Sequence, residues 1–553
     1  MKLEPTFEAF AAEHAAGRPQ LVRARLIDDL ETPVSAFLKL AAGRPYAGLL
    51  ESVEGGAFRG RYSILTLEPD LVWRCRGDRA EISQGPDLAA DRFQTEPDGA
   101  LASLKRLEAE SRIPLPADLP PMAAGLFGAV GYDMARLVER LPEPKPDPLD
   151  LPDAVLTRPS IVAVFDALKQ EIVLVTPVRP AGETAEAAWS AAEARLAGIR
   201  DALAQPLASN RTSPSDLFRG PSAPPSRTMG WQPGAAPNLP AGRTLGPRNK
   251  SEGDDRGGER EAAASMQGAA PQPPPIAFQS NTTADAFIAS VERAKRYIEA
   301  GDVFQVVPSQ RFSAALPWPS HAFYRALRRL NPSPYLFHLD LGGFQLAGSS
   351  PEILVRLRDG RVAIRPLAGT RPRGATPEHD AELERELLAD PKERAEHLML
   401  VDLGRNDVGR FARPGSVRVT QSFSVERYSH VMHIVSHVEG GALPDVNPID
   451  LLLGALPAGT LSGAPKIRAM EIIHELEPAK RGLAYAGAAG WISCDGEVDM
   501  CILLRTALIQ DGRIHVQAGA GVVADSDPQA EFQETLHKSE ALRRAAEEAW
   551  RFV

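Results

Sequence analysis

Runs of apolar residues separated by turn residues predict short strands in the first 204 residues. The runs 46–50, 62–67 and 161–165 combine aliphatic, β-branched and aromatic side chains, and a further run at 171–175 follows the last of them after a short polar turn. Two such runs so close in sequence indicate an antiparallel hairpin. The stretch 181–204 is rich in alanine and glutamate, which have high helix propensity, and predicts a helix.

The second half of the chain combines helical periods with hairpin signals. A capping sequence at 281–285 begins a predicted helix that ends at Gly301 and has one apolar face: Phe287, Val291, Ala294 and Ile298. Gly-Gly at 342–343 and Asp-Gly at 359–360 lie between apolar runs and predict hairpin turns. Further elements are expected as strands at 303–307, 417–425 and 485–523, and as helices at 378–388, 392–403, 448–456, 466–476 and up to Trp550. Strands dominate, so the pattern predicts an α+β fold with large, mainly antiparallel sheets and helices packed outside.

The periodicity stops between residues 205 and about 275. This segment is full of Pro, Gly, Ser and Arg, and it cannot bury enough apolar surface to offset the entropy of ordering it. The sequence therefore predicts three parts: an N-terminal domain at 1–204, a disordered insertion at 205–280 and a C-terminal domain at 281–553.

Composition narrows the class of protein. The 553 residues carry a formal net charge of −10, which argues against a nucleic-acid surface. The three cysteines, Cys75, Cys494 and Cys501, have neither metal-ligand spacing nor a disulfide framework, as expected in a reducing cytoplasm. No run approaches the ~18 apolar residues of a membrane span, and the N-terminus has no apolar signal-peptide core. We expect a soluble cytoplasmic protein.

The stretch 516–538 contains the strongest candidate binding site. It predicts a buried strand, a turn of small residues around Gly519 and Gly521, and a helix begun by Pro528. Glycines without a Cβ let backbone N–H groups approach a ligand closely. Glu531, Glu534 and Lys538 then share one helix face. That face fits either an ordinary solvated helix surface or an anion site with a metal ion.

Two motif matches in this half do not fit their usual function. The run 459–466, Gly-Thr-Leu-Ser-Gly-Ala-Pro-Lys, resembles a P-loop, but its spacing is wrong and Pro465 lacks the N–H that a phosphate would use. Gly519-x-Gly521-x-x-Ala524 resembles a dinucleotide fingerprint, but Asp525 and Asp527 follow where a pyrophosphate would lie. We reject both interpretations.

Three polar residues occur in apolar contexts. Glu396 precedes an apolar run on a predicted helix, where it needs either an arginine partner or a shared Mg²⁺ with Glu534, since Mg²⁺ takes one or two carboxylates. His433 is expected to point inward from a strand, as a structural or a catalytic histidine. Arg505, expected on an apolar strand, needs a carboxylate partner from the protein or a ligand.

The region from Asp285 to Ala546 resembles the chorismate-utilising enzymes. The resemblance rests on several motifs in order: 301–307 (Gly-Asp-Val-Phe-Gln-Val-Val), 350–352 (Ser-Pro-Glu), 366–371 (Pro-Leu-Ala-Gly-Thr-Arg), 395–407 (from Ala-Glu-His to Arg-Asn-Asp), 457–466 and 519–538. Within that family the chain is most similar to the large subunits of anthranilate synthases. Ala368 stands where aminodeoxychorismate synthases carry a nucleophilic lysine, and Gln305 stands where isochorismate synthases place a lysine that activates water. Without either lysine, external ammonia is the expected nucleophile.

The resemblance implies a reaction and a set of site residues. Chorismate and ammonia would give anthranilate and pyruvate, with Glu352 as a general acid whose pKa is expected to be raised by nearby negative charge. His433 would assist the loss of pyruvate, and Thr460 and Thr370 would place the ring. Mg²⁺ would be held by Glu396 and Glu534 with Glu531 nearby. The substrate would be bound by Gly369, Thr370, Tyr485, Arg505, Gly519, Ala520, Gly521 and Lys538.

The same resemblance implies regulation and a partner. Two segments match the family's tryptophan-binding signatures: Leu50, Glu51 and Ser52, and Pro334, Tyr335 and Leu336. Feedback inhibition by L-tryptophan, at the first committed step of tryptophan biosynthesis, is therefore expected. The chain has no Gly-x-Cys-x-Gly turn, so ammonia would come from a glutamine amidotransferase subunit, in a heterotetramer. Two alternatives stay open: an aminodeoxychorismate synthase of folate biosynthesis and a non-catalytic tryptophan-sensing homologue.

Overall fold

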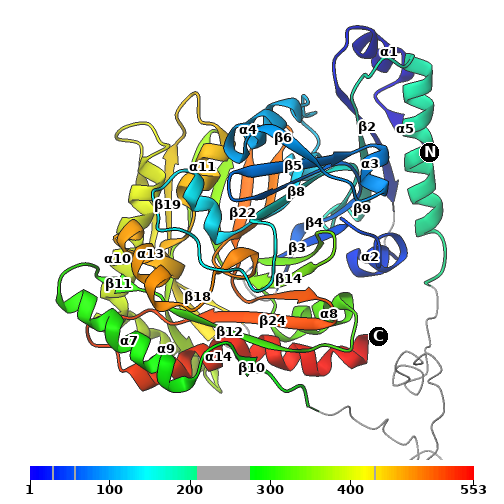
Figure 1. Ribbon diagram of the computed structural model, residues 1–553. Helices are drawn as coiled ribbons and strands as arrows, with labels where there is room; N and C mark the ends of the chain where they lie inside the picture. Colours follow the sequence, from blue (N-terminus) through cyan, green and yellow to red (C-terminus); the bar gives the residue numbers. More distant parts are fainter. Residues whose placement is uncertain (28–29, 55–57, 208–274, 429–430) are drawn as a thin grey trace, which may run out of the picture. The chain divides into compact units, whose positions relative to one another are not determined.

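The computed structural model describes residues 1–27, 30–54, 58–207, 275–428 and 431–553, and Figure 1 shows their arrangement. Among these residues, 22 strands form one hydrogen-bonded sheet network, and a small second sheet joins β11 to β20. Every strand pairing in the described ranges is antiparallel, and helices pack on the outside of the strands. The predicted α+β class with mainly antiparallel sheets is confirmed.

The N-terminal segment contains long strands and few helices. Its strands are β1 (Leu3–Glu4), β2 (Gln20–Ile27), β3 (Gly48–Glu54), β4 (Phe58–Arg76), β5 (Arg79–Gln84), β6 (Gln94–Gly99), β7 (Gly125–Val130), β8 (Ala154–Asp166) and β9 (Glu171–Val178). Its helices are α1 (Phe7–Ala15), α2 (Pro33–Leu40), α3 (Pro86–Ala89), α4 (Ala100–Glu110), η1 (Pro121–Ala123), η2 (Tyr132–Leu137) and α5 (Ala185–Leu203). The predicted hairpin is β8 with β9, where Phe165 pairs with Ile172.

The C-terminal segment adds the remaining elements. Its strands are β10 (Gln279–Ser280), β11 (Gln305–Val306), β12 (Ser309–Ala315), β13 (Tyr335–Asp340), β14 (Gln345–Ser350), β15 (Ile353–Arg358), β16 (Arg361–Ile364), β17 (Leu367–Pro372), β18 (Arg418–Arg427), β19 (Val431–Gly441), β20 (Gly463–Ala464), β21 (Ala488–Ser493), β22 (Val498–Ile502), β23 (Thr506–Gln510) and β24 (Arg513–Gly519). Its helices are α7 (Ala284–Glu299), α8 (Ser320–Leu330), α9 (Pro377–Ala389), α10 (Pro391–Gly409), α11 (Pro448–Ala455), α12 (Gly459–Ser462), α13 (Lys466–Leu476), η3 (Gly482–Ala484), α14 (Pro528–Glu548) and η4 (Ala549–Phe552).

Both predicted hairpin turns are present, because β13 pairs with β14 and β15 with β16. One predicted strand is much shorter than expected. The apolar run 303–307 forms only the two-residue strand β11, because its antiparallel partner β20 is itself two residues long.

Strands from the two segments pair directly with each other. β3 pairs with β13, where Glu51 lies opposite Leu336, and β7 pairs with β21, where Ala129 lies opposite Ala489. One buried cluster takes inward side chains from strands of both segments, among them Val155 of β8. The described parts of the predicted domains 1–204 and 281–553 belong to one compact unit. Most of the predicted insertion, residues 208–274, lies outside the described residues.

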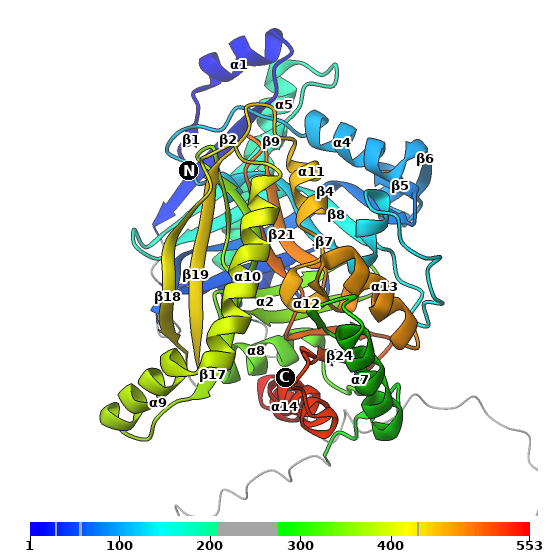
Figure 2. The same cartoon turned by 90° about the vertical axis from the view of Figure 1, so that its left-hand side faces the viewer.

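Two helices place the candidate site residues, and each begins at a side-chain cap. Asp527 accepts a hydrogen bond from the Ala530 N–H (2.8 Å) at the start of α14, with Pro528 at the first helical position. Asp390 caps α10 in the same way, and α10 packs along β17 and β19, as Figure 2 shows. No helix in the described part of the chain is long and apolar enough to cross a membrane.

Candidate active site

Glu352 lies in the turn between β14 and β15 and is 7% exposed. The Thr460 hydroxyl, from α12, lies 3.2 Å from each carboxyl oxygen and donates to the carboxyl group. Burial raises the pKa of Glu352 to about 8, whereas nearby Arg505 and Lys538 lower it. The raised pKa agrees with the role of an acid, but the expected cause was wrong: low polarity, and not negative charge, keeps the group protonated.

His433 is buried near the start of β19 and is positioned through its Nδ1 atom. That atom lies 3.0 Å from the Gly369 carbonyl oxygen and 3.0 Å from the Thr370 hydroxyl. A carbonyl can only accept, so Nδ1 carries the proton and Nε2 keeps its lone pair. Nε2 is buried without a hydrogen-bond partner among the described residues. Burial lowers the pKa of His433 to about 4, so the neutral ring can act as a base at physiological pH.

A β-bulge at Gly369 brings that carbonyl to His433. The register between β17 and β19 shifts between Ala368 and Thr370, and Gly369, the extra residue, has a φ of 67°. A Cβ at Gly369 would lie 3.2 Å from side-chain atoms of Glu393, Ile434 and Leu387. Glycine is therefore required here both by the backbone conformation and by close packing.

Arg505 supplies a cation without a protein partner. It is half-buried in the connection between β22 and β23, with a φ of 49°, so its expected position on a strand was wrong. This turn conformation directs the residue out of the strand ladder. Its guanidinium forms no hydrogen bond or ion pair with the residues that the structure describes, although Glu352 and Tyr428 lie close enough to affect its pKa. A half-buried arginine without a partner is suited to binding an anionic ligand.

Small residues shape the turn after β24. A Cβ at Gly519 would lie 2.8 Å from the Tyr485 hydroxyl oxygen, and one at Gly521 would lie 2.9 Å from Nε2 of Gln305. Lys538 donates to the Gly519 carbonyl (3.2 Å). The Ala520 N–H already donates to the Pro308 carbonyl (3.1 Å), so it is not free for a ligand.

Three carboxylates lie beside this turn. The Glu396 carboxylate accepts from Gln305 Nε2 at 3.3 Å, and the expected alternative of an arginine ion pair is not found in the described ranges. Burial raises the pKa values of Glu396 and Glu531, and the charge of Glu534 adds to both. Glu531 Oε2 is buried without a partner in the described part of the chain, and Glu534 forms an ion pair with Lys538 at 2.6 Å.

This carboxylate set fits a hard divalent cation with further ligands from a substrate or water. Within the described ranges, no group of three or more His, Cys, Asp or Glu residues is placed to hold a metal ion, so the three carboxylates alone do not form a complete cation site. The mutual repulsion of the carboxylates and the orphaned Glu531 oxygen are the features that a cation would relieve.

The two predicted tryptophan-binding segments lie side by side on neighbouring strands. Leu50 and Glu51 of β3 pair with Phe337 and Leu336 of β13. The Glu51 carboxylate is not free: it accepts from the Tyr324 hydroxyl (2.6 Å) and from Arg328 (2.8 Å). On the other side of the pairing, the Tyr335 hydroxyl donates to Asp499 (2.9 Å). Pro334 directly precedes β13 and Ser52 lies on β3.

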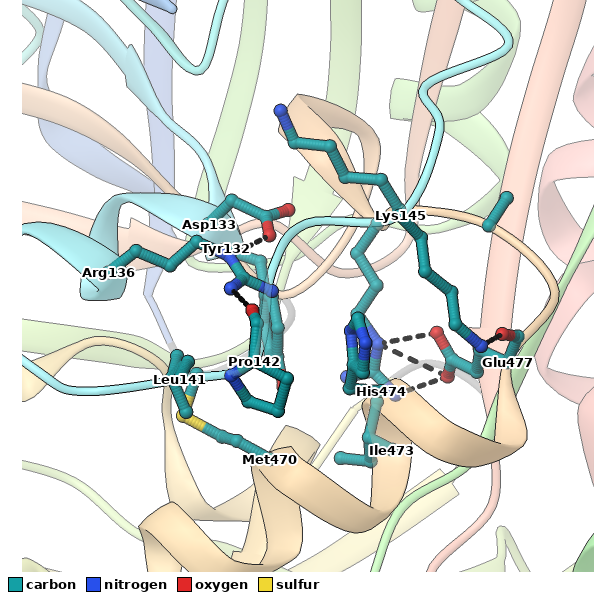
Figure 3. Close-up of a pocket in the computed structure, with 13 residues that line it drawn as sticks. Tyr132, Asp133, Arg136, Leu141, Pro142, Lys145, Met470, Ile473, His474 and Glu477 are labelled. Carbon is teal, nitrogen blue, oxygen red and sulfur yellow. Dashed lines mark hydrogen bonds and ion pairs between the residues drawn. The ribbon is translucent and has the colours of Figure 1, made fainter. Parts of the chain in front are cut away.

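Two further residues next to the site were missed by the sequence. Glu477 and Arg481 form a buried ion pair after α13, and both line the small pocket shown in Figure 3. The only sign of this ion pair in the sequence is the spacing of four residues between the glutamate and the arginine. Lys466, the last residue of the rejected P-loop match, begins α13, and its Nζ atom is 3.0 Å from both carboxylate oxygens of Asp407.

A family model described as chorismate binding enzyme matches residues 244–544, more than half of the chain. The chain belongs to this chorismate-binding family. Anthranilate synthase component 1 of Cereibacter sphaeroides is 50% identical over 549 residues, covering 99% of this chain and 98% of that protein. The same component of Thermus thermophilus is 43% identical, covering 95% and 98%. The predicted resemblance to the large subunit of anthranilate synthase is confirmed over nearly the full length.

Solved structures of family members agree in fold. Anthranilate synthase component I from Streptococcus pneumoniae superposes with a TM-score of 0.68 at 32% identity, covering 94% of this chain and 99% of that one. The menaquinone-specific isochorismate synthase from Escherichia coli superposes with a TM-score of 0.63 at 18% identity, covering 98% and 100%, and shows the shared fold only.

Proposed function

We propose that the protein is a Mg²⁺-dependent anthranilate synthase large subunit, a lyase that converts chorismate and ammonia to anthranilate and pyruvate. The observation that carries the proposal is the pairing of a buried acid with a buried neutral base beside an unpartnered cation. Glu352 has a pKa of about 8, His433 has a pKa of about 4, and Arg505 lacks a partner in the described residues. Two titratable groups with pKa values driven apart by their surroundings are typical of acid–base catalysis.

The residues divide the reaction into two steps. Arg505 and Lys538 bind the substrate carboxylates and orient the ring. As ammonia forms a bond to C2, the two ring double bonds shift from C1–C2 and C5–C6 to C1–C6 and C4–C5, the C4–O bond breaks, and the Glu352 proton leaves with the hydroxyl as water. The aminated intermediate then loses its C2 proton to His433 Nε2 while the bond between C3 and the enolpyruvyl oxygen breaks, which gives the aromatic ring and the enolate of pyruvate. The proton held by His433 is returned to the CH₂ carbon of the enolate and completes pyruvate.

The carboxylates Glu396 and Glu534, with Glu531 beside them, would hold the Mg²⁺ ion. When bound, Mg²⁺ neutralises and orients a substrate carboxylate and does not need to generate hydroxide. The hydrogen bond from Gln305 fixes Glu396 before any cation arrives. The pKa values of Glu396 and Glu531 are raised first by burial and further by the neighbouring carboxylates, a repulsion that a bound cation would relieve.

We propose a separate glutamine amidotransferase subunit as the ammonia source, in a cytoplasmic heterotetramer. The three cysteines are buried, and none lies in a Gly-x-Cys-x-Gly turn, so this chain supplies no glutaminase nucleophile.

We also propose feedback inhibition by L-tryptophan at the β3–β13 pairing. The Glu51 carboxylate accepts from Tyr324 and Arg328, and the acceptor capacity left on its two oxygens would bind an ammonium group. The strands offer apolar side chains for an indole ring.

The purified chain, with chorismate, Mg²⁺ and ammonium at alkaline pH, tests the proposal through anthranilate fluorescence. We expect fluorescence that disappears with a chelator, returns with Mg²⁺ and falls with tryptophan. Chorismate consumed without anthranilate would indicate aminodeoxychorismate or isochorismate chemistry instead. Chorismate left untouched, even with a glutaminase subunit and glutamine, would refute the proposed reaction.

A further inference from the structure

A buried ion pair lies between α13 and η3 and contacts the segments that carry candidate site residues. Arg481 Nη2 is 2.5 Å from Glu477 Oε1, and the two residues are 3% and 5% exposed. Burial of an ion pair costs free energy unless both partners are fully hydrogen-bonded. Both partners of this pair form further hydrogen bonds, and these bonds go to segments that carry candidate site residues.

Arg481 connects three segments through its guanidinium. It donates to the carbonyl oxygens of Leu461 (2.7 Å) and Val307 (2.6 Å), and it lies over the Tyr485 ring at 5.3 Å from the centroid. Leu461 directly follows Thr460, which holds the Glu352 carboxyl group. A planar guanidinium suits this task because its donors have a fixed geometry.

Glu477 extends the same network to the small turn after β24. One of its oxygens accepts from the Ser309 N–H (2.8 Å) and the Ser309 hydroxyl (2.7 Å). Ser309 pairs with Gly519 across β12 and β24, and its hydroxyl accepts from Gln517 at 2.8 Å. The carboxylate therefore fixes the backbone beside Gly519.

The outer side of the pair is held by the N-terminal segment. Lys145 donates to the carbonyl oxygens at the end of α13, those of Glu475 (3.3 Å) and Glu477, and Figure 3 shows the contact with Glu477. The Tyr132 ring lies 4.9 Å from the Arg481 guanidinium carbon. These contacts fix the position of the pair from the side of the pocket, so it is held between the two segments.

We infer that Arg481 and Glu477 are positioning residues, which fix Thr460 against Glu352 through Leu461 and fix the turn at Gly519 through Ser309 and Tyr485. The inference rests on the proposed reaction, because its readout is the rate of that reaction. Neither residue touches the reacting atoms; both act by holding those that do.

The Arg481→Lys variant tests this role. A lysine keeps the charge opposite Glu477 but cannot reach both carbonyls and the carboxylate with one planar group. We expect kcat to fall at least ~10-fold and KM for chorismate to rise a few-fold, the rough cost of a small misplacement at a reacting centre. Arg61→Lys is the matched control, because Arg61 donates to the buried Asp166 on N-terminal strands outside the site.

A pH profile separates positioning from general destabilisation. Thr460 lowers the pKa of Glu352, as do Arg505 and Lys538, while Tyr428 is the other titratable group beside it. Arg481→Lys should weaken the Thr460 contact and shift the alkaline limb of kcat to higher pH, measured at constant free ammonia. Thr460→Val should shift the limb in the same direction, and the double variant should shift it no further than Thr460→Val alone.

Several outcomes would overturn the inference. A folded Arg481→Lys enzyme with wild-type kcat, KM and pH profile would do so, as would additive shifts in the double variant. If Arg481→Lys does not fold, the same kinetic constants and pH profile are measured for Glu477→Gln. In that variant the amide oxygen still accepts from Ser309 while the negative charge opposite Arg481 is lost. A wild-type chain that stays inactive even with a glutaminase subunit and glutamine would instead refute the proposed reaction, so the two failures are distinguishable.

Discussion

At the scale of single residues, opposite electrostatic roles arise from one physical cause. Glu352 and His433 are both buried, and burial disfavours the charged form of each. For a carboxyl group this means a raised pKa and a retained proton, and for an imidazole a lowered pKa and a free lone pair. Burial therefore prepares both an acid and a base.

The first prediction concerns Glu352. Its acid form exists below a pKa of about 8 and is lost as the pH rises through that value. At constant free ammonia, kcat should therefore fall above about pH 8. Glu352→Gln should lower kcat by about 10²–10⁴-fold, the usual contribution of a general acid. Glu108→Gln, at a buried carboxylate on α4, is the control. Wild-type turnover in Glu352→Gln would exclude Glu352 as the acid.

The second prediction concerns His433. Without its Nε2 lone pair, the first step should proceed and the second should slow, because the C2 proton has no acceptor. His433→Gln should accumulate an aminated, non-aromatic product that mass spectrometry detects, with anthranilate formation reduced about 10²-fold or more. The matched control, His515→Gln, changes a buried histidine of β24 that binds Ser313. Normal anthranilate release from His433→Gln would assign the proton to another group.

At the scale of elements, irregular backbone places the reactive groups. Gly369 is the extra residue of a β-bulge, Arg505 occupies a positive-φ turn, and Glu352 and Thr460 occupy a turn and a four-residue helix. Regular strands and helices supply the frame, and their ends or interruptions carry the chemistry. Such positions are common at functional sites because strain is maintained there by the surrounding structure.

The third prediction follows from the bulge. Gly369→Ala forces a side chain into positive φ, at a cost of about 1 kcal/mol, and adds 3.2 Å contacts that must relax. We expect the His433 hydrogen bond to shift and kcat to fall about 10-fold. Gly360→Ala is a closely matched control, since Gly360 has the same φ of 67° and nothing within 4 Å of the added Cβ. Equal effects on kcat in the two variants would show that strain alone is responsible.

At the scale of the whole molecule, the two segments share their sheets. The segments predicted to bind tryptophan lie where β3 of the first segment pairs with β13 of the second. The Tyr335–Asp499 hydrogen bond then links β13 to β22, whose Ile502 N–H donates to the Glu352 carbonyl (3.0 Å). A ligand that displaces β13 would therefore act on strands that contact the acid.

The fourth prediction tests regulation at this scale. Glu51→Gln removes the carboxylate expected to bind the tryptophan ammonium group, so half-maximal inhibition should need at least ~10-fold more tryptophan, about the effect of a charged hydrogen bond. The uninhibited kcat should stay within about twofold, because Glu51 contacts Tyr324 and Arg328 and no residue of the catalytic group. Glu81→Gln on β5 is the control. Unchanged inhibition would place the inhibitor elsewhere.

The sequence alone determined the elements and the family. Local patterns predicted the β8–β9 hairpin, the capping segment of α7, the start of α14 at Pro528 and the antiparallel class, because these depend on local propensity and turn chemistry. Motif order identified the chorismate-binding family, and the candidate residues were named from it. Local patterns carry this information because backbone preferences act over a few residues.

Only the tertiary structure decided what those residues can do. Burial, and not nearby negative charge, raised the pKa of Glu352, and Arg505 proved to lie in a turn without a partner in the described residues. The β3–β13 pairing and the Arg481–Glu477 network join residues more than 150 positions apart. Desolvation and long-range contacts depend on everything packed around a group, so no local pattern can determine them.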